Sequence, residues 1–261
     1  MERASHREVG RIADSFRRVN SSVRLFLLTK VEDEMITANI LTRVLYIKYG
    51  QGTGTAFTIE INERQYLITA NHVVSGIKDG ESISIFHDSN WEDIPVKLIN
   101  CDKPDVDIIV LAASQQLTPT LPLEPTMDGL VFGQDVYFLG FPFGFFTEDR
   151  GGFNNRFPFP FIKKGIISAI DKSSDGIVSL FVDGHNNPGF SGGPIVFVDL
   201  NTQKLKVGGV VSGYHSQEAP IYYQGTQLPF VSNLNTGLLV GYGIHHAVDA
   251  IKANPIGVKV T

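Results

Sequence analysis

From residue 36 onward, short apolar runs alternate with Gly, Pro, Asn and Asp, and many of the apolar residues are β-branched or aromatic. This pattern is typical of antiparallel strands, because an amphipathic helix would repeat its apolar positions every three or four residues. The runs that predict strands are RVLYIKY, GTAFTIEI, QYLITA, SISIFH, PVKLIN, DIIVLAA, DVYFLGF, GIISAI, IVSLFV, PIVFVD and VGGVVSGY. The pattern therefore indicates an all-β protein.

Helical spacing occurs only near the two ends. Residues 5–20 predict a surface helix, whose apolar face carries Val9, Ile12, Phe16 and Val19. That face is narrow, which favours packing on the protein over binding to a membrane surface. The segment HHAVDAIKAN predicts a short final helix with Ala247, Val248 and Ile251 on its apolar face.

The length and the apolar fraction suit two β-barrels. The chain has 261 residues, of which 43% are hydrophobic, and barrels of about 100 residues each fit that length. The segment LTPTLPLEPTMDG contains three prolines and no strand pattern, so it is the best candidate for a link between two halves. We expect a helical extension at 1–35, barrels at 36–125 and 126–244, and a helix with a tail at 245–261.

Charge and cysteine content exclude several classes of protein. The net charge is -5 with both signs interspersed, so there is no basic footprint for nucleic acid. Cys101 is the only cysteine, which rules out an internal disulfide and favours a reducing compartment. The N-terminal residues lack an apolar signal region, and the run VRLFLL is too short to span a bilayer. We therefore expect a cytoplasmic protein without an integral membrane segment.

One serine lies in an unusually constrained stretch, NNPGFSGGPIV, which surrounds Ser191 with three glycines and two prolines. Such a stretch forms either an ordinary tight turn or a nucleophile turn whose backbone approaches a carbonyl. In YLITANHVV, His72 follows an apolar strand and could act as a base. Asp107 directly precedes the strand IIVLAA and could orient that base, with Asp105 and Asp102 as close competitors.

The order His72, Asp107, Ser191 is the chain order of the chymotrypsin-type triad. With these residues the chain resembles the trypsin-like serine proteases, and it is most similar to their bacterial HtrA/Deg-type branch. The resemblance covers about residues 45–245 and rests on GTGTAF, YLITANHVV, DVDIIVL, GQDVYFLGFPFG, GIISAI, DGHNNPGFSGGPIV and VGGVVSGY. It implies two six-stranded antiparallel β-barrels of the chymotrypsin type, and a bacterial origin.

The resemblance also implies roles for single residues. It makes the chain a serine endopeptidase with His72 as base, Asp107 as orienter and Ser191 as nucleophile. The backbone N–H groups of Gly189 and Ser191 would form the oxyanion hole. His185 would lie at the floor of the specificity pocket, with a wall made by Ser212, Gly213 and Tyr214 that pairs with a protein or peptide substrate. Because no acid lies at that floor, we expect cleavage after an uncharged side chain. The resemblance implies a reaction that uses no cofactor and no metal.

Three departures from the family keep a second function open. Phe190 precedes the nucleophile where Asn or Asp is usual, the N-terminal activation motif is absent, and no PDZ domain fits after VGYG. The alternative is a catalytically impaired module that binds extended peptides or a partner protein. A lipase or esterase is disfavoured, because that class places its serine before its histidine on an α/β scaffold. Residues 143–164 carry seven phenylalanines, and this segment either folds onto the barrel or forms a contact between subunits.

Overall fold

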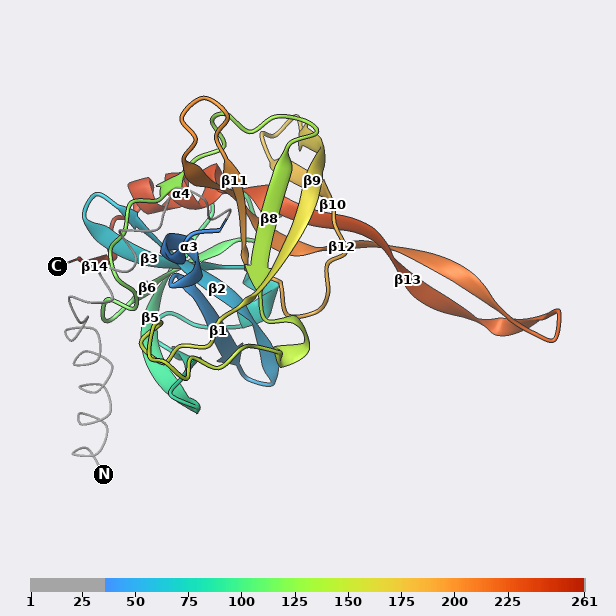
Figure 1. The fold of residues 1–261 in the computed structure, drawn as a ribbon, viewed down its shortest axis with the longest axis horizontal. Helices are drawn as coiled ribbons and strands as arrows, with labels where there is room; N and C mark the ends of the chain where they lie inside the picture. Colours follow the sequence, from blue (N-terminus) through green and yellow to red (C-terminus); the bar gives the residue numbers. More distant parts are fainter. Residues whose placement is uncertain (1–35, 261) are drawn as a thin grey trace.

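The apolar runs form two closed β-barrels in the computed structural model, which describes residues 36–260 (Figure 1). The expected all-β, chymotrypsin-type architecture is therefore confirmed. The helix predicted at 5–20 lies outside the described residues. No helix within the described part of the chain is long and apolar enough to cross a membrane.

The first barrel contains six antiparallel strands that close through the pairing of β3 with β6. A short helix, α3, precedes it, and the two-residue strand β14 extends its sheet beside β3. The elements are α3 Ala38–Leu41, β1 Val44–Tyr49, β2 Gly52–Ile61, β3 Arg64–Thr69, the 3-10 helix η1 Asn71–Val74, β4 Ser82–His87, β5 Asn90–Asn100, β6 Ile109–Ala113 and β14 Val258–Lys259.

The second barrel also contains six antiparallel strands, and it closes through β11 and β12. The proline-containing link includes a two-residue strand, β7. This strand lies near the end of the link that enters the second barrel, and it pairs in parallel with β12. The elements are β7 Glu124–Pro125, β8 Asp135–Gly140, the 3-10 helix η2 Pro142–Gly144, β9 Phe161–Lys172, β10 Val178–Asp183, β11 Pro194–Val198, β12 Leu205–Tyr223, β13 Thr226–Gly243 and the helix α4 His245–Ala253.

The burial of each strand follows its surroundings. In β5, Ile94 and Val96 are buried while Asp93 and Lys97 are exposed, because one face of that strand meets water. Strand β6 is buried on both faces. Its odd-numbered residues belong to the core of the first barrel. Its even-numbered residues pack with α4 in the core between the barrels. The predicted C-terminal helix thus covers the strand that Asp107 precedes.

The sequence of residues 214–237 predicts an extended loop near the substrate cleft, but the structure differs. They continue β12 and β13 as a long antiparallel hairpin that leaves the second barrel (Figure 1). Its turn is Gln224-Gly225, with φ values of 48° and 79°, the left-handed pair that a two-residue hairpin turn requires. The prediction was wrong because prolines and amides interrupt the alternation of apolar and polar positions.

The phenylalanine-rich segment 143–164 folds back partly on the first barrel. Phe157 is buried against the ring of His87, whereas Phe143, Phe145 and Phe153 are exposed. Asp149 organises this segment by accepting three backbone N–H groups.

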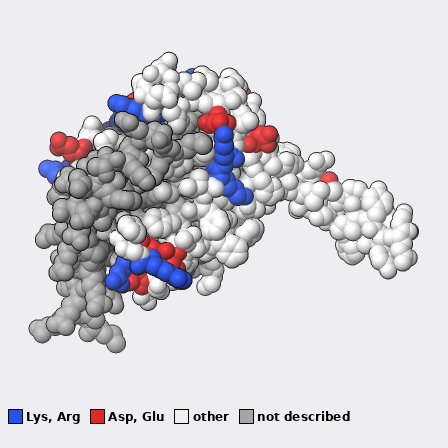
Figure 2. All heavy atoms as spheres, in the orientation of Figure 1, with Lys and Arg blue, Asp and Glu red and all other residues white. Residues whose placement is uncertain are grey.

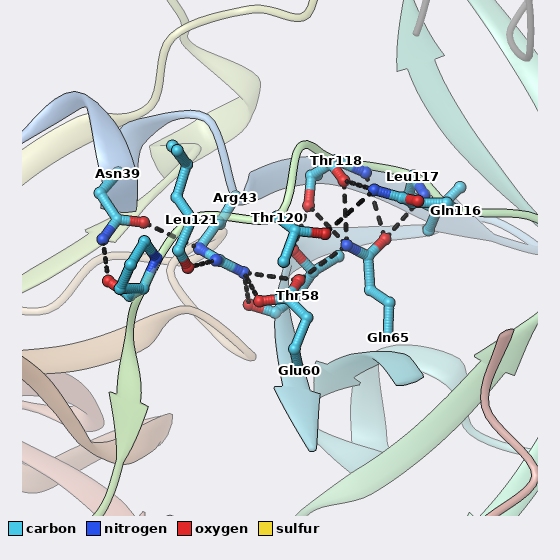
Figure 3. A network of polar contacts seen from close by, with 11 residues as sticks. Asn39, Arg43, Thr58, Glu60, Gln65, Gln116, Leu117, Thr118, Thr120 and Leu121 are labelled. Carbon is cyan, nitrogen blue, oxygen red and sulfur yellow. Dashed lines mark hydrogen bonds and ion pairs between the residues drawn. The ribbon is translucent and has the colours of Figure 1, made fainter. Parts of the chain in front are cut away.

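A buried polar network ties the first barrel to the segment that links the barrels (Figure 3). Arg43 is completely buried, and one of its nitrogens lies 2.6 Å from a carboxylate oxygen of Glu60. The guanidinium also donates to the carbonyl of Leu121, and Gln65 donates to the carbonyl of Thr118 at 3.0 Å. The network thereby fixes the link where it crosses the end of the barrel.

We predict that Glu60→Gln lowers the free energy of unfolding by about 3–5 kcal/mol, because it leaves the Arg43 charge buried without its counter-ion. Chemical denaturation followed by circular dichroism would measure the change. As a control, Glu148→Gln removes an exposed ion pair with Arg150 and should cost under about 1 kcal/mol. Equal losses in the two variants would contradict this account of the network.

Candidate functional site

Glycines around Ser191 are required by close backbone contacts. Gly189 has φ +104°, and a Cβ there would lie 2.2 Å from the carbonyl oxygen of Phe141. Gly192 has φ +84°, and its Cβ would lie 2.1 Å from the carbonyl oxygen of Thr55. Any larger residue would be strained and would also push the turn away from its neighbours. The turn is therefore pressed against both barrels at once.

Thr55, in β2 of the first barrel, binds this turn directly. Its N–H donates to the carbonyl of Ser191 at 2.9 Å, and its hydroxyl donates to the carbonyl of Gly189 at 2.6 Å. The same hydroxyl oxygen accepts the N–H of Phe141 at 3.2 Å. The sequence predicts the strand GTAFTIEI, but no motif in it signals this contact between barrels.

Two backbone donors beside Ser191 are free. The Pro188 carbonyl accepts the N–H of Phe143 at 2.8 Å, which fixes the peptide plane before Gly189. Among the hydrogen bonds of residues 36–260, neither the N–H of Gly189 nor that of Ser191 has an acceptor. Since unpaired backbone donors are rare, a pair of them beside a serine hydroxyl is suited to binding an anionic oxygen.

His72 and Asp107 meet because their strands pair. His72 lies in η1 directly after β3, and Asp107 lies two residues before β6. Strands β3 and β6 are antiparallel, with Thr69 opposite Ile109, so the end of one meets the start of the other. One oxygen of Asp107 lies 2.6 Å from Nδ1 of His72, and the other accepts the His72 N–H at 2.9 Å.

These contacts shift the pKa values of both groups. The hydrogen bond with Asp107 raises the pKa of His72 above its ordinary value, and burial opposes this only in part. Burial alone would raise the pKa of Asp107. Hydrogen bonds from the His72 ring, the Ser212 hydroxyl and the His72 backbone nevertheless keep the pKa of that carboxyl below its usual range. Asp107 is therefore an ionised partner that holds His72 by Nδ1, which leaves Nε2 for chemistry.

Ser212 links Ser191 to His72 and Asp107. Its hydroxyl donates to Asp107 at 2.6 Å, and its carbonyl accepts the Ser191 hydroxyl at 2.9 Å. The proton of Ser191 is thus directed at Ser212, and the side chain must rotate before His72 can accept that proton. Sequence reasoning placed Ser212 in the substrate-binding wall and missed its contact with Asp107, for which no motif gives a signal.

The residues before Ser191 differ in burial. His185 is exposed, and its carbonyl accepts the ammonium of Lys163 at 2.7 Å. Asn186 is 1% exposed, and its Nδ2 donates to the carbonyl of Gly213 at 2.9 Å. The Oδ1 of Asn186 is buried without a partner. Turning the amide over would place this oxygen against the Gly213 carbonyl, so the bond from Nδ2 to Gly213 fixes the amide with its oxygen unpaired.

The other candidates lie apart from this cluster. Asp102 and Asp105 are exposed, and the structure brings neither of them to His72. Burial raises the pKa of Cys101 to about 12, so its thiol is not a reactive nucleophile. Within residues 36–260, no group of three His, Cys, Asp or Glu side chains is arranged to hold a metal ion.

Comparisons with solved structures show the same fold. Rv3671c from M. tuberculosis H37Rv, in an inactive form, is 18% identical with a TM-score of 0.52, over 85% of this chain and 91% of that one. The HtrA-type protease AlgW with a tripeptide is 21% identical with a TM-score of 0.54, over 84% of this chain. The matched part is 61% of the AlgW chain.

Comparison with family models identifies the family of this chain. No curated protein matches the chain. The family model of the trypsin-like peptidase domain matches residues 52–202, which is more than half of the chain. This stretch contains His72, Asp107 and Ser191. The chain therefore belongs to the trypsin-like peptidase domain family, as its resemblance to trypsin-like serine proteases predicts.

Proposed function

We propose that this protein is a serine endopeptidase that hydrolyses peptide bonds through His72, Asp107 and Ser191 by way of an acyl-enzyme. The observation that supports this most strongly is the pair of free N–H groups at Gly189 and Ser191. A structural turn has no use for two unpaired donors, whereas an acyl-transfer site needs them where the oxyanion forms.

In the proposed mechanism, Ser191 leaves the Ser212 carbonyl and gives its proton to Nε2 of His72 while its oxygen attacks the substrate carbonyl. The N–H groups of Gly189 and Ser191 stabilise the oxyanion. His72 then gives its proton to the leaving amine, and the acyl group stays on Ser191. Water, deprotonated by His72, then attacks the acyl carbon, and the imidazolium returns this proton to the Ser191 oxygen as the bond to the acyl group breaks and the acid product leaves. Asp107 stabilises the imidazolium in both halves of the reaction.

We further propose that Ser212, Gly213 and Tyr214 pair with the backbone of the substrate. The side chain at the cleavage site would lie between this wall and the residues before Ser191, near His185 and Asn186.

One observation favours the alternative, a module that binds peptides without cutting them. Ser191 donates to Ser212, so its hydroxyl rests in an inactive orientation. Labelling with a fluorophosphonate probe separates the two functions. Labelling of the wild type that is lost in Ser191→Ala supports the peptidase, and an unlabelled but folded wild type supports the module.

We predict that His72→Ala and Ser191→Ala each reduce kcat by several orders of magnitude, and that the double variant is hardly slower than either one. The residues act as one unit, so the second substitution has little left to remove. Rates of peptide hydrolysis under single-turnover conditions would measure this. Strictly additive losses would show that the two residues act independently.

We predict that Asp107→Asn lowers kcat by about 10⁴-fold, as in comparable triads. Because Asp107 raises the pKa of His72, the variant should also move the acidic limb of the kcat/KM profile to lower pH. His72 must be neutral to act as a base, so activity falls as the pH drops through its pKa. The matched control Asp105→Asn should keep both the rate and the profile, and a larger loss there would refute the assignment.

A further inference from the structure

The hairpin of residues 214–237, called the arm here, projects beyond both barrels (Figures 1 and 2). Glu218 is its only Asp, Glu, Lys or Arg residue, and the arm is almost entirely white in Figure 2. Apolar side chains are exposed along its length: Tyr214, Ile221, Tyr222, Tyr223, Phe230, Val231 and Leu234.

Both outer edges of the arm lack a partner strand within residues 36–260, and the edge formed by β12 is the one that contains Ser212 and Gly213. Strand β12 pairs with β11 on one edge, from Leu205 to Val210. On its other edge, β12 pairs with β13 as far as Tyr223. The pairing of β11 with β12 ends at Val210. Beyond that residue, no strand within residues 36–260 pairs with this edge of β12. A two-stranded hairpin is only marginally stable in water, and exposed strand edges are normally blocked by lysines, prolines or a covering element. Here the first proline of β12 is Pro220.

The open edge continues from the candidate active site along the same strand, with irregularities in its pairing with β13 between Val211 and Gly213 and between Tyr214 and Ser216. The same strand contains Ser212, which contacts both Ser191 and Asp107, and Gly213, which accepts from Asn186. Tyr214, the last residue of the substrate-pairing wall, is also the first residue of the arm. From Tyr214 to Ala219 the edge extends for about 20 Å at the usual rise per strand residue.

We propose that the arm is a docking edge for the substrate, which adds to β12 as an extended strand. This rests on the proposed function and extends it to the class of substrate: unfolded or extended polypeptide with an uncharged, partly apolar segment before the scissile bond. Strand β12 runs outward from the site, and antiparallel pairing is the more stable kind. An antiparallel substrate therefore runs inward, and the residues that precede the scissile bond lie on the arm.

Continuity with the catalytic serine favours substrate over a second copy of this chain as the occupant. Main-chain hydrogen bonds along an edge give affinity without demanding one sequence, and the exposed apolar side chains favour apolar segments. The lack of charge on the arm suits segments that would be buried in a folded protein.

Peptides that share one cleavage sequence, found by digesting a peptide library, would test this. We expect a peptide with ten residues before the scissile bond to have at least tenfold higher kcat/KM than one with four, mainly through a lower KM. The same extension placed after the scissile bond should give no gain. N-methyl groups on the added residues should abolish the gain, because they remove the main-chain donors.

A shortened arm provides the matching variant. Ser216 pairs with Asn235, so residues 217–234 can be replaced by Asn-Gly, which makes a tight turn between these partners. The variant should cut the short peptide as fast as the wild type does and should lose the gain with length. As a control, Phe230→Ser changes the tip but not the β12 edge, and it should keep that gain.

Binding to Ser191→Ala, measured by fluorescence anisotropy, separates this proposal from the proposed function. Tighter binding of the long peptide, lost on shortening the arm, supports the docking edge even if the wild type cuts nothing. Hydrolysis at equal rates for both peptides, or a gain that survives in the shortened arm, overturns it. A dimer that depends on the arm, without any effect of peptide length, would assign the edge to a second copy and also overturn it.

Discussion

The contact of Thr55 with the glycine-rich turn around Ser191 is the constraint on which the rest of the site depends. His72 and Asp107 come from the first barrel and Ser191 from the second, so the site exists only at the relative position that holds them together. One threonine supplies an N–H to Ser191 and a hydroxyl to Gly189 across that boundary. Gly192 permits the approach, because a side chain there would strike the carbonyl of Thr55. The free donors of the turn are oriented by the same contact.

Strand pairing positions the remaining groups. Antiparallel pairing of β3 with β6 brings the end of one strand, with His72, to the start of the other, with Asp107. Strand β12 of the second barrel brings Ser212 to the boundary between the barrels. There Ser212 contacts Asp107 with its hydroxyl and Ser191 with its carbonyl. The same strand continues outward as the arm, so the contacts of Ser212, the proposed substrate-pairing wall and the open edge lie on one strand.

The strands and the three chemical residue types could be predicted from sequence because each has a local signal. Buried strands such as IIVLAA are uniformly apolar, and glycines that must adopt positive φ stand out around Ser191. Strand β13 escaped prediction because Pro229 and several amides interrupt its alternation, and its pairing with β12 comes from a tight turn rather than from burial. The exposed ring of His185 and the buried amide of Asn186 could not be told apart, since adjacent polar residues carry no signal of which one faces the interior.

The sequence by itself determined the all-β class, the family and the residue types available for catalysis, because periodicity, glycine placement and chain order are local properties. Only the tertiary structure decided which aspartate meets His72, which threonine binds the glycine-rich turn around Ser191 and where the hydroxyl of Ser191 points. Each of those contacts joins residues far apart in the chain, for example Ser212 with Asp107 and Thr55 with Gly189. Their geometry depends on barrel closure and strand register, which no single segment encodes.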